Sequence, residues 1–250
     1  MRYFVQFSYK GKPYHGWQKQ PNAITVQEVL EKAFSLMLRE TVSLTGAGRT
    51  DSGVHAKVMY AHFDTDVLFN CTELIYRLNA FLPDDIAVSE IFEVPLESHA
   101  RFDALERIYE YWIVQEKNPF LTDAAYYVKY PLNIEQMNEA ATILVEHKDF
   151  KCFSKSNTDV KTYLCDVRKA IWTYDGDKLV FTISADRFLR NMVRAIVGTL
   201  VDVGLGKSSL TDIESVFASK DRSNAGVSVP AKGLYLTAIK YPKNIIDYNG

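Results

Sequence analysis

The chain has 250 residues, of which 47% are hydrophobic and 24% are charged, and its net charge at pH 7 is −2. This composition is expected of a soluble globular protein. No apolar run approaches the roughly 20 residues that a membrane-spanning helix needs. The net charge neither supports nor excludes nucleic-acid binding, because such binding depends on a local basic face rather than on the total charge.

The cysteines and the N-terminus point to a reducing compartment. Cys71, Cys152 and Cys165 are odd in number and widely spaced, which favours neither a disulfide framework nor a zinc site. Residues 1–6 contain no signal-peptide core and look like the start of a strand. We therefore expect a cytoplasmic protein.

The first hundred residues predict strands with two helices packed on one face. Alternating apolar residues indicate a strand over residues 2–9, and a Thr25-x-x-Glu28 capping box predicts the start of an amphipathic helix. The remaining elements expected here are strands over 42–46, 57–64 and 86–94 and a helix around 74–82. This is the pattern of an α+β sandwich.

The pattern then recurs in the second half. The elements expected there are a strand over 105–114, a helix around 137–145 capped by Asn133, a hairpin of 166–174 and 178–184 joined at a type I′ turn at Asp175-Gly176, a long helix over 188–204, a shorter helix capped by Thr211-x-x-Glu214, and a strand over 233–241. We expect two similar halves, residues 1–100 and 101–250, that share one continuous sheet and enclose a cleft.

Residues 46–56, Gly-Ala-Gly-Arg-Thr-Asp-Ser-Gly-Val-His-Ala, form the segment most indicative of function. The glycines allow a tight loop that presents Asp51. Arg49 lies two residues earlier and would project to the same side in an extended segment, where its charge would keep the carboxylate ionised. An aspartate that merely caps a turn fits the same residues, so both interpretations stay open.

Arg187, Arg190 and Arg194 are spaced to share one face of the predicted 188–204 helix. A solvated face is the ordinary interpretation of such spacing. However, cations near a helix N-terminus oppose the helix dipole, and no acid is nearby in sequence. An external anion, or a carboxylate from the other half, would explain the three arginines, and Arg194 best suits the second option.

Tyr109 shares a strand face with Arg107 and Tyr111. A tyrosine on a strand usually packs in the core, but this arrangement could also offer a platform on which a base stacks. His55, His62 and Asp64 could be imagined as metal ligands, although their spacing matches no metal motif.

The motifs together identify the chain as resembling the TruA family of tRNA pseudouridine synthases. The segment 46–56 resembles the family signature, and Phe188-Leu189-Arg190-Asn191-Met192-Val193-Arg194 resembles its long helix. The other matching segments are Gly16-Trp17-Gln18, Arg107-x-Tyr109-x-Tyr111, Asp221-Arg222 and Pro230-Ala231-x-Gly233-Leu234-Tyr235. The resemblance covers nearly the whole chain in order.

The resemblance implies the pseudouridine-synthase fold, with two ferredoxin-like halves in a mostly antiparallel sheet. It implies an isomerase without cofactor or metal that converts uridine to pseudouridine at tRNA positions 38, 39 and 40, working as a homodimer. Asp51 would be the catalytic aspartate, acting as nucleophile or as base. The substrate-binding residues it implies are Tyr109, Arg49, Arg194 and Leu234.

Further tRNA contacts are expected at Arg107, Arg187, Arg190 and Lys10. Lys10 stands where the family often has Asp, so it adds a positive charge. The alternative function is a non-catalytic RNA-binding protein with the same fold. Asp51 distinguishes the enzyme from the RNA-binding protein, because a carboxylate that faces RNA phosphates would only weaken RNA binding in a protein without catalysis. A metal-dependent hydrolase that uses His55 and Asp51 is the third interpretation.

Overall fold

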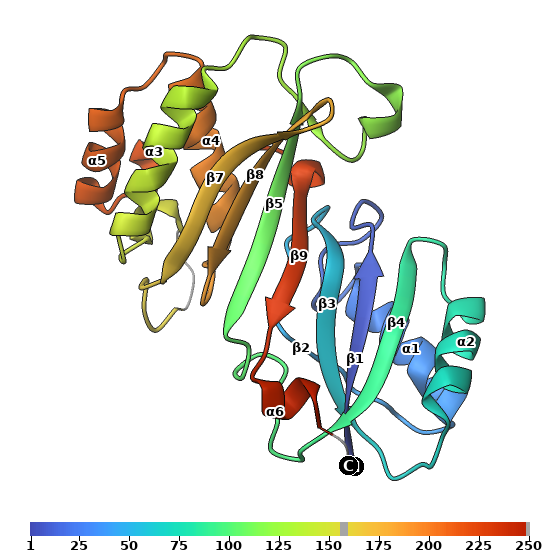
Figure 1. The fold of residues 1–250 in the computed structure, drawn as a ribbon. Coiled ribbons are helices and arrows are strands. Elements are labelled where there is room, and N and C mark those ends of the chain that lie inside the picture. The colour runs from blue at the N-terminus through green and yellow to red at the C-terminus, as the bar shows by residue number, and fades with distance from the viewer. Residues whose placement is uncertain (156–159, 249–250) are drawn as a thin grey trace. The chain divides into compact units, whose positions relative to one another are not determined.

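The computed structural model describes residues 1–155 and 160–248. They form two compact units, one made of residues 1–106 with the segment from Leu236 onward, the other of residues 107–235. Each unit combines a sheet with helices (Figure 1), which confirms the predicted α+β class. In the part of the chain that the structure describes, no helix is both long and apolar enough to cross a bilayer.

The expected halves differ from these units in the C-terminal segment, which belongs to the first unit rather than the second. Aromatic packing explains the difference. The ring of Tyr241 lies edge-on to those of Phe4 and Tyr60, with centroids 5.3 Å apart in both pairs. Its hydroxyl also donates a buried hydrogen bond of 2.5 Å to the carbonyl oxygen of Ala100. Periodicity along the chain does not reveal such a partner.

The sheet of the first unit has the strand order β4-β1-β3-β9, with β2 added to β3. Its strands are β1 (Arg2–Tyr9), β2 (Thr45–Gly46), β3 (His55–Asp64), β4 (Ile86–Val94) and β9 (Leu234–Lys240). β1 pairs antiparallel with both β3 and β4. The strand expected over 42–46 is shorter than predicted, because side chains of α1 accept its backbone hydrogen bonds: Val42 N donates to Ser35 Oγ, and Leu44 N to Glu31 Oε1.

Helices α1 (Val26–Leu38) and α2 (Cys71–Phe81) lie on one face of this sheet, as predicted (Figure 1). α1 begins where expected, since Thr25 Oγ1 accepts a hydrogen bond from Glu28 N at 3.4 Å. Its apolar face is buried, and the ring of Phe34 packs against that of Phe63 with centroids 5.0 Å apart. A short helix, α6 (Lys243–Ile246), follows β9.

The sheet of the second unit has the order β5-β8-β7, with β6 parallel to β5. Its strands are β5 (Glu106–Val114), β6 (Tyr126–Tyr127), β7 (Val167–Asp175) and β8 (Lys178–Ala185). The predicted hairpin is present, but Asp175 pairs with Lys178, so the two turn residues are Gly176 and Asp177. A type I′ turn needs positive φ at both. Among the described residues only Gly176 of this pair has it, at 61°, so the predicted turn type is wrong.

Helices α3 (Ile134–Glu146), α4 (Met192–Gly204) and α5 (Leu210–Ser219) belong to the second unit. Asn133 caps α3 as predicted, with its Oδ1 accepting from Gln136 N at 3.0 Å. The predicted cap of α5 is wrong. A cap at Thr211 would start the helix at residue 212, whereas α5 starts at Leu210. Ser209 is the cap: its Oγ accepts from Asp212 N at 3.3 Å, and Asp212 Oδ2 accepts from Ser209 N at 2.7 Å.

Candidate functional site

The first group of candidate residues lies on the loop between β2 and β3. Asp51 is half-buried and begins a turn, in which Val54 N donates to the Asp51 carbonyl oxygen at 3.2 Å and Gly53 has a φ of 79°. Burial alternates, since Thr50 is buried whereas Arg49 is exposed. Arg49 and Asp51 therefore both face away from the core.

Thr50 anchors this loop to the core from beneath. Its Oγ1 lies 2.8 Å from the hydroxyl of Tyr9 in a buried hydrogen bond, and its carbonyl oxygen accepts from Trp17 N at 3.3 Å. Gly16 passes so close that a Cβ there would lie 2.4 Å from the Thr50 carbonyl oxygen, and its φ of 88° favours glycine as well. The Gly16-Trp17 motif and the Asp51 loop are thus parts of one packed structure.

His55 has a structural role in this loop. It is buried, and its Nδ1 accepts a hydrogen bond of 3.0 Å from Gly11 N. An imidazole whose Nδ1 accepts from a backbone N–H is the tautomer protonated at Nε2. The lone pair that a metal would need at Nδ1 is already used, which weakens the interpretation of His55 and Asp51 as metal ligands.

Lys10 lies at the end of β1 and is exposed. Its backbone N donates to the carbonyl oxygen of Asp85 at 2.9 Å, which leaves the ammonium group at the surface of the first unit. The next residue, Gly11, contacts the Asp51 loop, because a Cβ there would lie 1.9 Å from the Val54 carbonyl oxygen. Lys10, Arg49 and Asp51 thus come from neighbouring segments of the first unit.

The second group lies in the other unit, where β5 and the segment after β8 meet. The ring of Tyr109 is half-buried and stands edge-on to that of Phe188, with centroids 5.1 Å apart and planes at 86°. Arg107 Nη1 donates to the Asp186 carbonyl oxygen at 2.6 Å. β5 and β8 pair so that Arg107 faces Ala185 and Tyr109 faces Ile183, and the chain that leaves β8 returns to Tyr109 through Phe188.

The three arginines do not share a helix face, and that prediction is wrong. α4 begins at Met192, so Arg187 and Arg190 precede it and Arg194 lies in its first turn instead of deep in the helix. Two local features delay the helix. Asn191 is left-handed, with φ at 66°, and the Asp186 carboxylate accepts from its own neighbour, Arg187 N, at 2.8 Å and from Asp166 N at 2.7 Å.

Arg194 is half-buried and bound to the segment that precedes β9. Its Nε donates to the Val229 carbonyl oxygen at 2.7 Å, and Val229 N donates back to the Arg194 carbonyl oxygen at 3.2 Å. Tyr111 holds the same segment, since its hydroxyl donates to the Pro230 carbonyl oxygen at 2.8 Å. Burial raises the pKa of Tyr111, while the nearby charge of Arg194 works in the opposite direction.

Leu234 follows directly on this segment and is buried. The preceding Gly233 packs on the ring of Tyr111, where a Cβ would lie 2.7 Å from Cζ. Arg194 and Gly233 therefore both lie near Tyr111, Leu234 is the next residue after Gly233, and Tyr109 lies two residues from Tyr111 on the same face of β5. Arg190 is exposed, with its carbonyl oxygen accepting from Lys155 N at 3.0 Å.

Sequence reasoning missed three residues that hold these groups in place, namely Tyr9, Phe188 and Val229. Tyr9 was predicted only as one apolar residue of a strand, and Phe188 only as part of a motif. Val229 binds Arg194 through its backbone, which leaves no trace in the side-chain pattern. Only the position of Val229, directly before the motif at 230–235, is a signal that could have indicated it.

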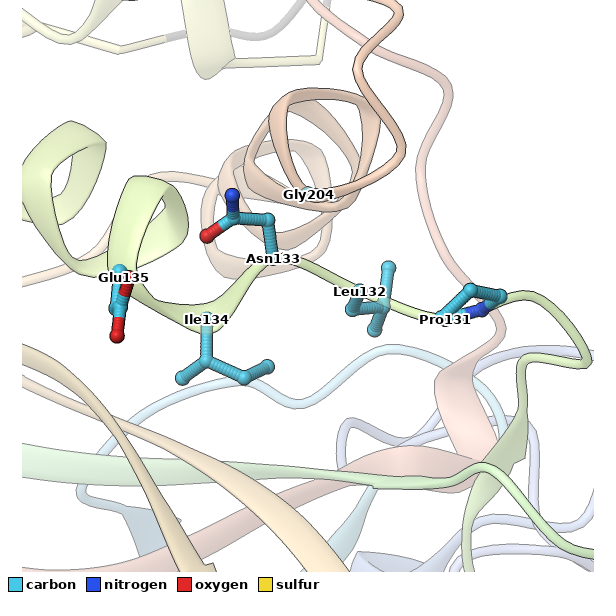
Figure 2. Close-up of a pocket in the computed structure, with 6 residues that line it drawn as sticks. All are labelled: Pro131, Leu132, Asn133, Ile134, Glu135 and Gly204. Carbon is cyan, nitrogen blue, oxygen red and sulfur yellow. The ribbon is translucent and has the colours of Figure 1, made fainter.

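An open hollow elsewhere in the second unit contains none of the candidate residues (Figure 2). It is lined by Pro131, Leu132, Asn133, Ile134, Glu135 and Gly204. The charged residue of this lining is Glu135, and its carboxylate would repel a phosphate group. This hollow therefore does not suit a ligand that carries phosphates.

The comparisons with known proteins all identify the same family. A family model described as tRNA pseudouridine synthase matches residues 6–103 and 140–242. The chain is 48% identical over 241 residues to a tRNA pseudouridine synthase A of Azobacteroides pseudotrichonymphae, covering 96% of this chain and 97% of that protein. It is 48% identical to the protein of that name from Parabacteroides distasonis, over 98% of this chain and 97% of the other. The Bacillus subtilis protein of that name is 40% identical, over 96% of this chain and 99% of its own length.

Proposed function

The chain belongs to the tRNA pseudouridine synthase family, and on this premise we propose that it converts uridine to pseudouridine at positions 38, 39 and 40 of tRNA. The single observation that supports a catalytic role most strongly is the placement of Asp51. A half-buried carboxylate follows an exposed arginine on a loop whose other side is fixed to the core by Thr50. Such a loop presents a fixed charge to an incoming ligand.

The reaction is an intramolecular rearrangement of the nucleoside in which only protons are exchanged with water. The N1–C1′ bond breaks, the uracil turns, and a C5–C1′ bond forms. The proton on C5 is then lost to solvent, and N1 gains one. Asp51 must be ionised to take part, either as a nucleophile or as a base on the ribose.

The target uridine must leave the base stack before it can react, at a cost of a few kcal/mol. Tyr109 replaces part of the lost stacking, and a base stacked on an aromatic ring contributes about 1–3 kcal/mol in other proteins. The edge-on contact with Phe188 holds the Tyr109 ring in one orientation, so that less entropy is lost when the base binds. Leu234 supplies an apolar wall beside it.

The cations are assigned to the nucleotide and its phosphates. Arg49 and Arg194 hold the flipped nucleotide, and the second is already oriented by its bond to the Val229 carbonyl oxygen. The predicted pairing of Arg194 with Asp51 stays a prediction. The further tRNA contacts that we propose are Arg107, Arg187, Arg190 and Lys10.

We place the protein in the cytoplasm, where tRNA matures, as a homodimer whose subunits share one tRNA. With a chain of 28.5 kDa, light scattering should give about twice that mass. A mass of one chain at micromolar concentration, in the presence and absence of tRNA, would contradict the dimer. The rearrangement itself requires neither cofactor nor metal.

Mapping of pseudouridine in tRNA from cells that lack this protein tests the proposal. Positions 38, 39 and 40 should carry unmodified uridine, and a plasmid with the wild-type gene should restore all three. A plasmid with Asp51→Asn should not restore them, although the variant accumulates equally. Full modification without the protein would refute the proposed positions. Restoration by Asp51→Asn would instead favour the alternative, an RNA-binding protein without catalysis.

A further inference from the structure

The turn that carries Asp51 is held by a tyrosine far away in the sequence. The carbonyl oxygen of Tyr14 accepts hydrogen bonds from Ser52 Oγ at 3.2 Å and from Gly53 N at 3.4 Å. These two residues directly follow Asp51. The Tyr14 side chain is 5% exposed, so it points into the protein while its backbone holds the turn.

Tyr14 is in turn held by Asp85. The hydroxyl of Tyr14 donates to Asp85 Oδ1 at 2.5 Å, and the Asp85 carbonyl oxygen accepts from Lys10 N at 2.9 Å. Asp85 directly precedes β4, and β4 is fixed beside β1 by the pairing of Ile86 with Tyr9. One residue at the edge of the sheet therefore holds both ends of the segment 10–14.

The bond between Tyr14 and Asp85 is of a strong kind. A hydroxyl that donates to a carboxylate is charge-assisted and roughly twice as strong as a neutral pair. Burial, and then the bond to Asp85, raise the pKa of Tyr14. The hydroxyl therefore stays protonated and remains a donor across the neutral range.

The segment 10–16 packs directly against the loop that carries Asp51, so a movement of Tyr14 displaces that loop as well. Gly11 lies against the Val54 carbonyl oxygen and Gly16 against that of Thr50, at distances where a Cβ would be 1.9 Å and 2.4 Å away. The backbones of the two loops thus touch without side chains between them. A shift of Tyr14 passes directly to residues 52 and 53.

We infer that Tyr14 and Asp85 are positioning residues that fix the catalytic loop, with Asp85 acting through the Tyr14 hydroxyl and the Tyr14 carbonyl on the turn after Asp51. This inference rests on the proposed function of Asp51. Misplacement of a reacting group by about 1 Å can cost about 100-fold in rate. Loss of the pair therefore lowers the rate of the chemical step more than it lowers tRNA affinity.

Single-turnover tritium release from a tRNA transcript labelled at C5 of uridine, with protein in excess, measures the rate at saturation, and filter binding measures Kd. Tyr14→Phe and Asp85→Ala should each lower the saturated rate about tenfold and leave Kd within twofold. The double variant should be no slower than either single variant, because both remove the same link. Asp85→Asn should recover at least threefold of the Asp85→Ala loss, since an amide oxygen still accepts from the hydroxyl.

The exposed neighbour Asp84 provides the matched control, and Asp84→Ala should match wild type. A merely stabilising role would lower the melting temperature and the active fraction while leaving the rate per folded molecule unchanged. Should Tyr14→Phe fail to fold, the comparison of Asp85→Ala with Asp85→Asn tests the link, because both keep Tyr14.

The inference is overturned if the single variants keep rates within twofold of wild type, if the losses appear only in Kd, or if the two losses multiply in the double variant. Asp51→Asn in the same assay separates this failure from that of the proposed function. If Asp51→Asn is inactive and the Tyr14 and Asp85 variants are fully active, only the positioning role fails. If Asp51→Asn still releases tritium, the proposed function fails.

Discussion

Replacement of Gly198 by alanine should destabilise the protein, although Gly→Ala within a helix normally stabilises by about 0.5–1 kcal/mol. Gly198 lies in the middle of α4, where a Cβ would lie 1.9 Å from the Val227 carbonyl oxygen. Ordinary contact begins near 3.4 Å, so the segment around Val227 must retreat by about 1.5 Å.

That retreat breaks identifiable hydrogen bonds. Gly226 N donates to Thr199 Oγ1 at 2.8 Å, and Arg194 Nε donates to the Val229 carbonyl oxygen at 2.7 Å. A neutral bond contributes about 1 kcal/mol and one with a charged donor about 1.5–3 kcal/mol. After the gain in helix propensity, a net loss of about 2–3 kcal/mol remains, which corresponds to a fall in Tm of about 4–12 °C for a chain of this size.

Thermal unfolding followed by circular dichroism measures the effect. Gly48→Ala is the matched control, because no atom lies within 4 Å of a Cβ at Gly48 and its φ is not left-handed. That variant should melt within about 2 °C of wild type. A Gly198→Ala variant as stable as wild type, or more stable, would show that the contact with Val227 imposes no such cost.

Three other predictions concern charged groups. Burial lowers the pKa of His62 to about 4, so the unfolded chain, whose histidines titrate near 6.5, binds the extra proton between those values. Stability should therefore fall as the pH falls from about 6.5 to 4, and His62→Asn should flatten denaturant midpoints measured across that window; an unchanged slope contradicts this. Lys10→Glu should weaken tRNA binding and lower the slope of log K against log salt by about one, whereas Lys32→Glu on the exposed face of α1 should not; an unaltered slope for Lys10→Glu rejects the phosphate contact. Arg194→Lys keeps the charge but loses the planar donor group that reaches the Val229 carbonyl oxygen, so the saturated rate should fall about tenfold; a wild-type rate would show that charge alone suffices.

The parts of the fold that the sequence predicts well are those where local chemistry decides. Alternation along residues 2–9 and the cap at Thr25 specify β1 and the start of α1, because each needs only neighbouring residues. The loop at 46–56 was identified for a similar reason, since its glycines and charges lie within one segment.

The errors arise where a distant partner overrides the local pattern. The periodicity of α4 extends back to Leu189, but the bond from Asp166 N to the Asp186 carboxylate and the left-handed Asn191 keep the preceding residues out of the helix. Likewise, the strand expected over 42–46 gives its amides to Glu31 and Ser35 of α1. Neither partner can be deduced from spacing along the chain.

The choice of cap for α5 failed for another reason. Two overlapping boxes, Ser209 with Asp212 and Thr211 with Glu214, both satisfy the sequence rule. The structure uses the first, and Glu214 instead lies 3.1 Å from His147 Nε2. Only the tertiary contact of Glu214 distinguishes the two.

The most direct test of the account is a comparison of wild type and Asp51→Asn as purified proteins on one tRNA transcript. Pseudouridine is quantified by mass spectrometry after a single turnover, and tRNA affinity is measured in parallel. If Asp51 is the catalytic residue, Asp51→Asn should form no pseudouridine and should bind tRNA within about tenfold of wild type. Pseudouridine formation by Asp51→Asn at a rate near that of wild type would contradict this role.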